Sequence, residues 1–277
     1  MIRRTRVEVD LAAIIGNART VRAVTGTDVI AVVKADGYGH GAVAVARALT
    51  AARAVAGFGV SLVEEGVALR DAGVMAPVLV MGPSQHGGED DMVMAGLTPV
   101  IASAEELAAL AAVARRRGRT IDAHLKVDTG MGRLGVAEAE APGIAAEAGR
   151  SGIAIVGLMT HFACADTDDP ADPDSMTRAQ LRRFRDVDAA VTAAGAPVRV
   201  RHAANSSGAL LFPEARLDLV RTGIAIYGHG RWPAGAAHRA PSAGSFPKPA
   251  STLLRMAARS IVSAPVVIAA ANTGELI

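Results

Sequence analysis

The chain has 277 residues, of which 51% are hydrophobic and only 3% aromatic, so its core must be built from Ala, Val, Leu and Ile. The 29 basic and 27 acidic side chains leave a net charge of +2, which gives no reason to expect a nucleic-acid partner. No apolar run is long enough for a membrane span, the N-terminus lacks the apolar region of a signal peptide, and Cys164 is the single cysteine, which excludes an internal disulfide. We therefore expect a soluble, cytoplasmic protein with no membrane partner.

Helices and strands are predicted to alternate along the chain. The first helix is opened by Asp10, and the spacing of Leu11, Ile14 and Ala18 gives it one apolar side. Short, nearly continuous apolar runs then predict eight strands, at residues 29–34, 57–62, 76–82, 97–102, 122–128, 153–162, 197–205 and 217–228.

Amphipathic segments fill most of the intervals between these strands. One begins with a capping box formed by Ser103 and Glu106, and another places Phe184 and Val187 on one face and ends at Gly195. Strands that are apolar throughout are typical of a parallel sheet buried on both faces. Eight such units predict an α/β fold, and a closed (β/α)8 TIM-like barrel in preference to an open sheet.

The informative polar residues follow the predicted strands. Lys34, residues 126–133, His161, residues 202–206 and residues 221–224 each stand where one strand ends. Because the catalytic residues of (β/α)8 barrels lie at the carboxyl ends of the strands, we expect all of these residues at one rim.

The residue types at this rim indicate a phosphorylated carbonyl cofactor. Lys34 can form an imine with an aldehyde once neighbouring cations lower its pKa. Tyr38, Ser206 and the backbone N–H groups of Gly223 and Ile224 can hold a phosphate.

Two arginines complete the chemical pattern. Arg133 and Arg221 can contact a cofactor ring or a substrate carboxylate, for which a rigid fork of donors suits arginine better than lysine. The cofactor that meets all these needs is pyridoxal phosphate, which reacts with a lysine and draws electrons into its ring.

Two other interpretations are weaker. His40 and His202 do not have the helical spacing of metal ligands, so no metal is expected. Gly37 and Gly39 loosely match a dinucleotide-binding fingerprint, but Asp36 intrudes before the first glycine and no acidic residue follows about 20 positions later.

Six motifs follow one another from about residue 7 to residue 228: VEVDLAAIIGNAR, AVVKADGYGHGA, HLKVDTGMGRLG, THFACAD, HAANSSGAL and VRTGIAIYG. They occur in the order found in alanine racemases, and the chain resembles that family of fold-type III, barrel-based pyridoxal phosphate enzymes. The resemblance implies an isomerase that interconverts L-alanine and D-alanine, supplies D-alanine for peptidoglycan and forms a homodimer.

The resemblance also implies a role for each residue of the cofactor end of the site. Lys34 matches the lysine that holds the cofactor as a Schiff base and serves as one of two catalytic acid–bases. The phosphate-binding positions and the residue that supports them are matched by Tyr38, Ser206, Gly223, Ile224 and Asn205.

The remaining matches concern the cations. Arg133 matches an arginine near the phenolic oxygen of the cofactor and the substrate carboxylate, and Lys126 matches a lysine that is carbamylated in some members. His161 matches a histidine linked to Arg221, which matches the arginine facing the pyridine nitrogen. A guanidinium does not transfer its proton to that nitrogen, so the ring is a weaker electron sink, and this suits a racemase.

Family members continue into a second, mainly β domain, which supplies a catalytic tyrosine to the partner subunit. We expect residues 1–230 to be the pyridoxal phosphate-binding barrel and residues 231–277 to be a linker with a remnant of that domain, which is largely missing. The two tyrosines of the chain, Tyr38 and Tyr227, both belong to barrel motifs. Two functions therefore stay open, an alanine racemase and a barrel-only pyridoxal phosphate-binding protein with little or no racemase activity.

Overall fold

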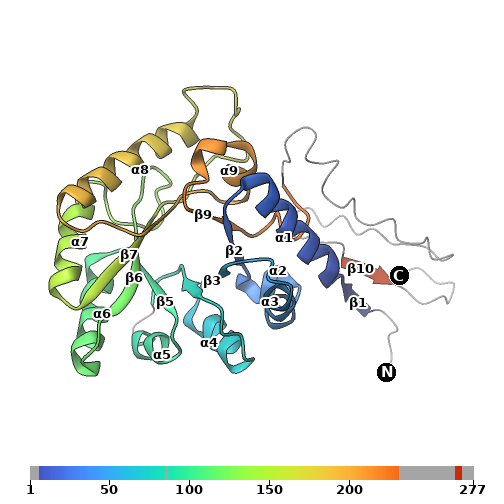
Figure 1. Cartoon of the computed structure of the whole chain (residues 1–277), viewed down its shortest axis with the longest axis horizontal. Coiled ribbons are helices and arrows are strands. Elements are labelled where there is room, and N and C mark those ends of the chain that lie inside the picture. The colour runs from blue at the N-terminus through green and yellow to red at the C-terminus, as the bar shows by residue number, and fades with distance from the viewer. Residues whose placement is uncertain (1–5, 85–86, 231–265, 270–277) are drawn as a thin grey trace.

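A parallel sheet of eight strands forms the centre of the molecule (Figure 1). The computed structural model describes residues 6–84, 87–230 and 266–269. Neighbouring strands are hydrogen-bonded in the order β8-β7-β6-β5-β4-β3-β2-β9. Each overlaps one predicted strand, and their bounds are β2 (Asp28–Val32), β3 (Gly57–Val60), β4 (Val78–Val80), β5 (Thr98–Ile101), β6 (Ile121–Lys126), β7 (Ile153–Met159), β8 (Val200–His202) and β9 (Leu219–Thr222).

Hydrogen bonds between the end strands β8 and β9 bring the sheet into a barrel. The Asp218 N–H donates to the carbonyl of Arg201 at 3.1 Å, and the Arg221 N–H donates to the carbonyl of Ala204 at 3.0 Å. The Asp218 carboxylate also accepts the Arg201 N–H at 2.6 Å. The predicted (β/α)8 barrel is thereby confirmed.

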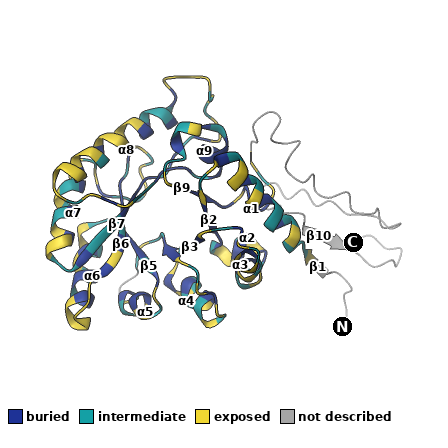
Figure 2. Ribbon diagram, in the orientation of Figure 1, coloured by how far each residue is buried: buried dark blue, intermediate teal, exposed yellow. Residues whose placement is uncertain are grey.

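Helices surround the barrel, and their buried faces point toward the strands (Figure 2). Asp10 accepts the Ala13 N–H, and Ser103 accepts the Glu106 N–H, as predicted for two helix starts. The outer elements are α1 (Leu11–Thr25), α3 (Ala42–Ala51), α4 (Val63–Asp71), α5 (Glu89–Met94), α6 (Ala104–Arg117), α7 (Ala141–Arg150), α8 (Met176–Ala193), α9 (Ser206–Leu211) and the 3-10 helix Pro213–Ala215.

Several predicted strands are too long at their carboxyl ends. The run 153–162 stops as β7 at Met159, because the next carbonyls have side-chain partners in place of a neighbouring strand. The carbonyl of Thr160 accepts from Arg221, and that of His161 accepts from Gln180. These early ends make room for the loops of the rim.

A second, two-stranded sheet lies beside the barrel, where β1 (Arg6–Val9) pairs antiparallel with β10 (Val266–Ala269) (Figure 1). β10 is the part of the predicted linker and remnant that the structure describes; residues 231–265 and 270–277 of that prediction lie outside the described residues. No helix in the described ranges is long and apolar enough to cross a membrane.

Candidate active site

The segment after β2 takes an unusual backbone conformation. Lys34 begins α2 (Lys34–Gly39), in which Ala35, Asp36, Gly37 and Tyr38 have φ angles of 51°, 51°, 63° and 54°. A left-handed conformation costs an L-residue about 1–2 kcal/mol, and three of these four residues are not glycine. The turn that places Lys34 is therefore stabilised by contacts from elsewhere.

Glu65 supplies one such contact. One carboxylate oxygen accepts the Ala35 N–H at 2.6 Å, and the other accepts the N–H groups of Ser61 and Leu62 at 2.8 and 3.1 Å. This carboxylate ties the end of β3 to the residue that follows Lys34. Sequence reasoning missed Glu65, although a glutamate three residues after a helix start is the spacing of a capping box.

The predicted phosphate-binding residues meet at the ends of β2, β8 and β9. Ser206 Oγ accepts the N–H groups of Gly223 and Ala225 at 3.2 and 3.3 Å. A Cβ at Gly223 would overlap the hydroxyl of Tyr38, so only glycine allows this approach. Ile224 is exposed at this edge.

Asn205 has a supporting position beside these groups. Its amide oxygen accepts the Gly208 N–H at 2.9 Å, and its amide nitrogen donates to the carbonyl of Phe162 at 3.2 Å. Asn205 thus fixes the start of α9 against the segment after β7.

Arg221 is a buried cation inside the barrel. It donates to the carbonyls of His202 at 2.8 Å, Thr160 at 2.6 Å and Ala203 at 3.1 Å. None of the ion pairs found among the described residues includes it. Burial lowers the pKa of Arg221 to about 9, and the three carbonyls favour the protonated guanidinium.

His161 lies where the predicted cations converge. Its Nδ1 is 3.4 Å from Arg221 Nη2. Burial and the positive charges of Arg221, Lys126, Arg133 and Lys34 together lower the pKa of His161 to about 3, with burial as the largest cause. One neutral imidazole therefore stands among four cationic side chains that come from the ends of three strands, β2, β6 and β9.

Lys126, at the end of β6, is buried like Arg221 and only 5% exposed. Burial and the charges of Arg221 and Arg133 lower its pKa to about 8, against opposing effects of Asp128 and Glu106. About a tenth of its amine is therefore neutral at pH 7, and most of it is charged.

Asp128 shapes the loop that carries Arg133. Its carboxylate accepts the backbone N–H groups of Gly130 at 2.9 Å, Met131 at 2.8 Å and Gly132 at 2.8 Å. Arg133 itself is exposed. Sequence reasoning missed Asp128, although an aspartate ahead of glycines is typical of such a turn.

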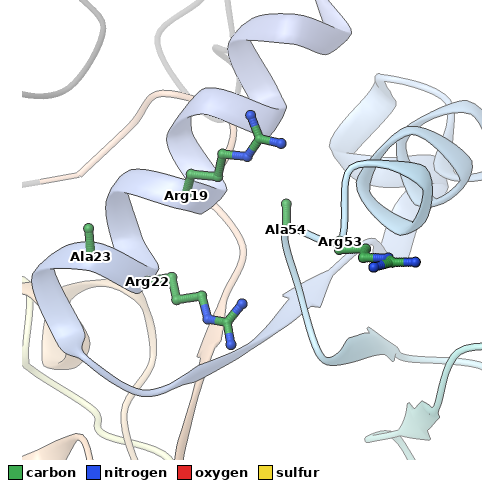
Figure 3. A pocket seen from close by; sticks show the side chains of 5 residues that line it. All are labelled: Arg19, Arg22, Ala23, Arg53 and Ala54. Carbon is green, nitrogen blue, oxygen red and sulfur yellow. The ribbon is translucent and has the colours of Figure 1, made fainter.

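A cavity of about 310 Å³ lies near the amino ends of β2 and β3, away from the rim (Figure 3). Arg19 donates to the carbonyl of Ala52 at 3.2 Å, and Arg22 pairs with Asp28 at 3.0 Å. We assign this cavity no chemistry, because two of its arginines already hold neighbouring segments; its lining is Arg19, Arg22, Ala23, Arg53 and Ala54. In the described part of the chain, no group of three or more His, Cys, Asp or Glu residues is arranged to hold a metal ion.

The fold and the rim define a (β/α)8-barrel protein with a strand-end lysine beside a cluster of cations. The family model described as "Alanine racemase, N-terminal domain" matches residues 9–230. The chain therefore belongs to the alanine racemase family.

Individual relatives agree with this assignment. An alanine racemase of Sorangium cellulosum is 44% identical over 237 residues, covering 82% of this chain and 61% of the relative. The structure of alanine racemase from Streptomyces lavendulae matches with a TM-score of 0.78 at 35% identity, covering 86% of this chain and 63% of that one. The Bartonella henselae enzyme with covalently bound pyridoxal phosphate matches with a TM-score of 0.74 at 28% identity, covering 84% and 67%. The chain spans about three fifths of the length of the curated relatives it matches.

Proposed function

We propose that the rim binds pyridoxal phosphate covalently through Lys34. The observation that carries the proposal is the convergence of Lys34, Lys126, Arg133 and Arg221 around His161. Such a concentration of positive charge suits an anionic cofactor and an amino-acid carboxylate.

The residues present fit the two ends of this cofactor. Ser206, Tyr38 and the backbone at Gly223 and Ile224 would hold the phosphate, and the absence of a Cβ at Gly223 lets the Tyr38 hydroxyl lie beside the Gly223 N–H that donates to Ser206. At the ring end of the cofactor, Arg221 would donate to the pyridine nitrogen without giving up its proton.

When bound, pyridoxal phosphate draws electrons from the Cα of an attached amino acid and thereby acidifies the proton on that carbon. The Lys34 amine would take and return this proton on one face of Cα. Arg133, at the exposed mouth of the site, would bind the substrate carboxylate, and Lys126 beneath it would position the guanidinium.

The reaction we propose is the interconversion of L-alanine and D-alanine. It rests on the family match over residues 9–230 and on the rim just described. We further propose that the enzyme works as a cytoplasmic homodimer that supplies D-alanine for the cell wall, as the family resemblance implies. A racemase needs an acid–base group on each face of Cα, and Tyr227 is not free for this role, because it is buried and its hydroxyl donates to the carbonyl of Val32.

Borohydride trapping tests the cofactor assignment. Protein loaded with pyridoxal phosphate is reduced and digested, and the adduct should be found on Lys34 by mass spectrometry. The Lys34→Arg variant, which keeps the positive charge, should give no adduct. An adduct on Lys126 in the unmodified chain would contradict the assignment.

Exchange with deuterated solvent tests the reaction. L-alanine and D-alanine are incubated separately with the loaded protein, and loss of the Cα proton is followed by NMR. Exchange with interconversion of both enantiomers supports a racemase. Exchange from one enantiomer without interconversion would identify a cofactor-binding barrel that moves the proton on one face only.

A further inference from the structure

We propose that His124 is a positioning residue that holds His202 in the tautomer required by Arg221 and thereby maintains the orientation of Arg221. Its effect on the cofactor rests on the proposed function, in which Arg221 faces the cofactor ring. The effect on His202 belongs to the chain alone and can be measured without any ligand.

Two short contacts connect the three side chains across the barrel. His124 Nδ1 lies 2.7 Å from His202 Nε2, and His202 Nδ1 lies 2.8 Å from Arg221 Nη1. The two imidazoles meet edge to face, with ring centroids 4.9 Å apart and planes at 66°. These distances are those of hydrogen bonds, so the three groups form one continuous chain.

The backbone of the barrel makes space for this contact. His124 is on β6 and His202 on β8, with β7 between them. The register of β6 on β7 shifts between Ala123 and His124, which places His124 opposite Gly157. A Cβ at Gly157 would lie 2.5 Å from His124 Nδ1, so any other residue there would displace the ring. The irregular pairing and the glycine together let the ring cross β7.

The direction of the hydrogen bonds follows from Arg221. A guanidinium donates and cannot accept, so His202 must accept with an unprotonated Nδ1 and carry its proton on Nε2. That N–H points to His124 Nδ1, which must therefore accept, so that the proton of His124 is on Nε2. Burial and the charge of Arg221 lower the pKa of His124 to about 4 and that of His202 well below its ordinary value, so both rings are neutral.

The consequence of losing His124 is a change at Arg221. Without His124, the buried Nε2–H of His202 loses its acceptor, and the cost of this unpaired donor opposes the preference for Nε2–H that Arg221 imposes. A proton on Nδ1 would face the Arg221 N–H as donor against donor, and the guanidinium would have to turn away. Arg221 would then lose its defined orientation toward the interior of the site.

Two substitutions separate this role from simple packing. His124→Asn places an amide oxygen where Nδ1 stood and keeps the acceptor, whereas His124→Leu keeps bulk and removes it. Leu125→Ala is the matched control, because Leu125 is the fully buried neighbour on the same strand and belongs to the hydrophobic core. It should lower stability without changing any histidine tautomer.

The measurement is the tautomer of His202, by long-range ¹H–¹⁵N NMR of the 277-residue chain labelled at histidine and arginine. We expect the Nε2–H form in the unmodified chain, in His124→Asn and in Leu125→Ala, and an Nδ1–H population with altered Arg221 resonances in His124→Leu. Pyridoxal phosphate should bind about tenfold more weakly to His124→Leu and within about twofold of the unmodified affinity to His124→Asn, as expected for one lost hydrogen bond at a charged group. An unchanged His202 tautomer in His124→Leu, or an Nδ1–H form in the unmodified chain, would overturn the inference. If no variant bound the cofactor but the tautomers shifted as described, the positioning role would stand and the proposed function would fail.

Discussion

Replacing Lys126 by methionine should stabilise the barrel at neutral pH. The pKa of Lys126 falls from 10.5 to about 8 in the folded chain. This difference corresponds to roughly 3 kcal/mol by which the folded state disfavours the charged amine. Methionine has a similar length and no charge, so Lys126→Met removes this cost while it still fills the space at the end of β6.

The pH dependence has a definite sign. Between pH 8 and 10.5 the unfolded chain keeps the Lys126 proton while the folded chain has lost it, so stability rises with pH across this window. Below pH 8 the full cost is present. The variant should therefore be more stable by up to about 3 kcal/mol at pH 7, and its advantage should shrink as the pH approaches 10.

Urea unfolding at a series of pH values, in buffer free of carbon dioxide, provides the assay. The other titrating groups are common to both proteins, so the difference between the two unfolding free energies reports on Lys126 together with its coupling to Arg221. A difference that stays constant from pH 7 to pH 10 would refute the reasoning. Bicarbonate should narrow the difference, because a neutral Lys126 amine can add to carbon dioxide, release a proton and become an anionic carbamate beside Arg133 and Arg221.

Three further substitutions test the rim, and a fourth, Gly143→Ala on α7, serves as a control. Gly223→Ala should cost about 1–3 kcal/mol in urea unfolding because its Cβ overlaps Tyr38, whereas Gly143→Ala, in open space on α7, should stabilise by up to about 1 kcal/mol. Asp128→Ala should cost about 1–3 kcal/mol and speed proteolytic cleavage of residues 128–135, since three N–H groups lose their acceptor. Glu65→Gln should cost about 1 kcal/mol and slow the reaction of Lys34 with pyridoxal phosphate, because the Glu65 carboxylate accepts the N–H of the next residue, Ala35. Unchanged rates would show that Glu65 does not position Lys34.

The barrel and its rim could be predicted from sequence because both depend on local patterns. The eight strands are predicted from apolar runs that alternate with segments of helical periodicity. Because the strands of such a barrel are parallel, the residues that follow them all lie at the same rim. This reasoning places Lys34, His161 and Arg221 at the rim, and in the structure the charges of Lys34 and Arg221 act on His161.

The internal contacts of the rim could not be predicted. His124 and His202 are 78 residues apart, and their contact depends on a register shift and on Gly157, neither of which has a local signature. The left-handed turn was only partly indicated, since its glycines suggest a permissive backbone but Ala35 and Asp36 share the same conformation. Such features arise from partners distant in sequence, which an apolar pattern does not record.

Three features of the rim each lower the stability of the folded chain. Arg221 has no carboxylate partner among the described residues, Lys126 is buried beside it, and the turn after Lys34 holds a strained backbone. None of these features is needed to pack a core made of Val, Leu, Ile and Ala. The burial of Arg221 and Lys126 becomes less costly when an anion enters the site, because the anion offsets the repulsion between the cations. A ligand at one hundred times its dissociation constant stabilises the folded state by about 2.7 kcal/mol, which is comparable to the cost carried by Lys126 alone. In the function that we propose, the two buried cations lower the stability of the empty barrel and raise its affinity for an anionic cofactor and substrate.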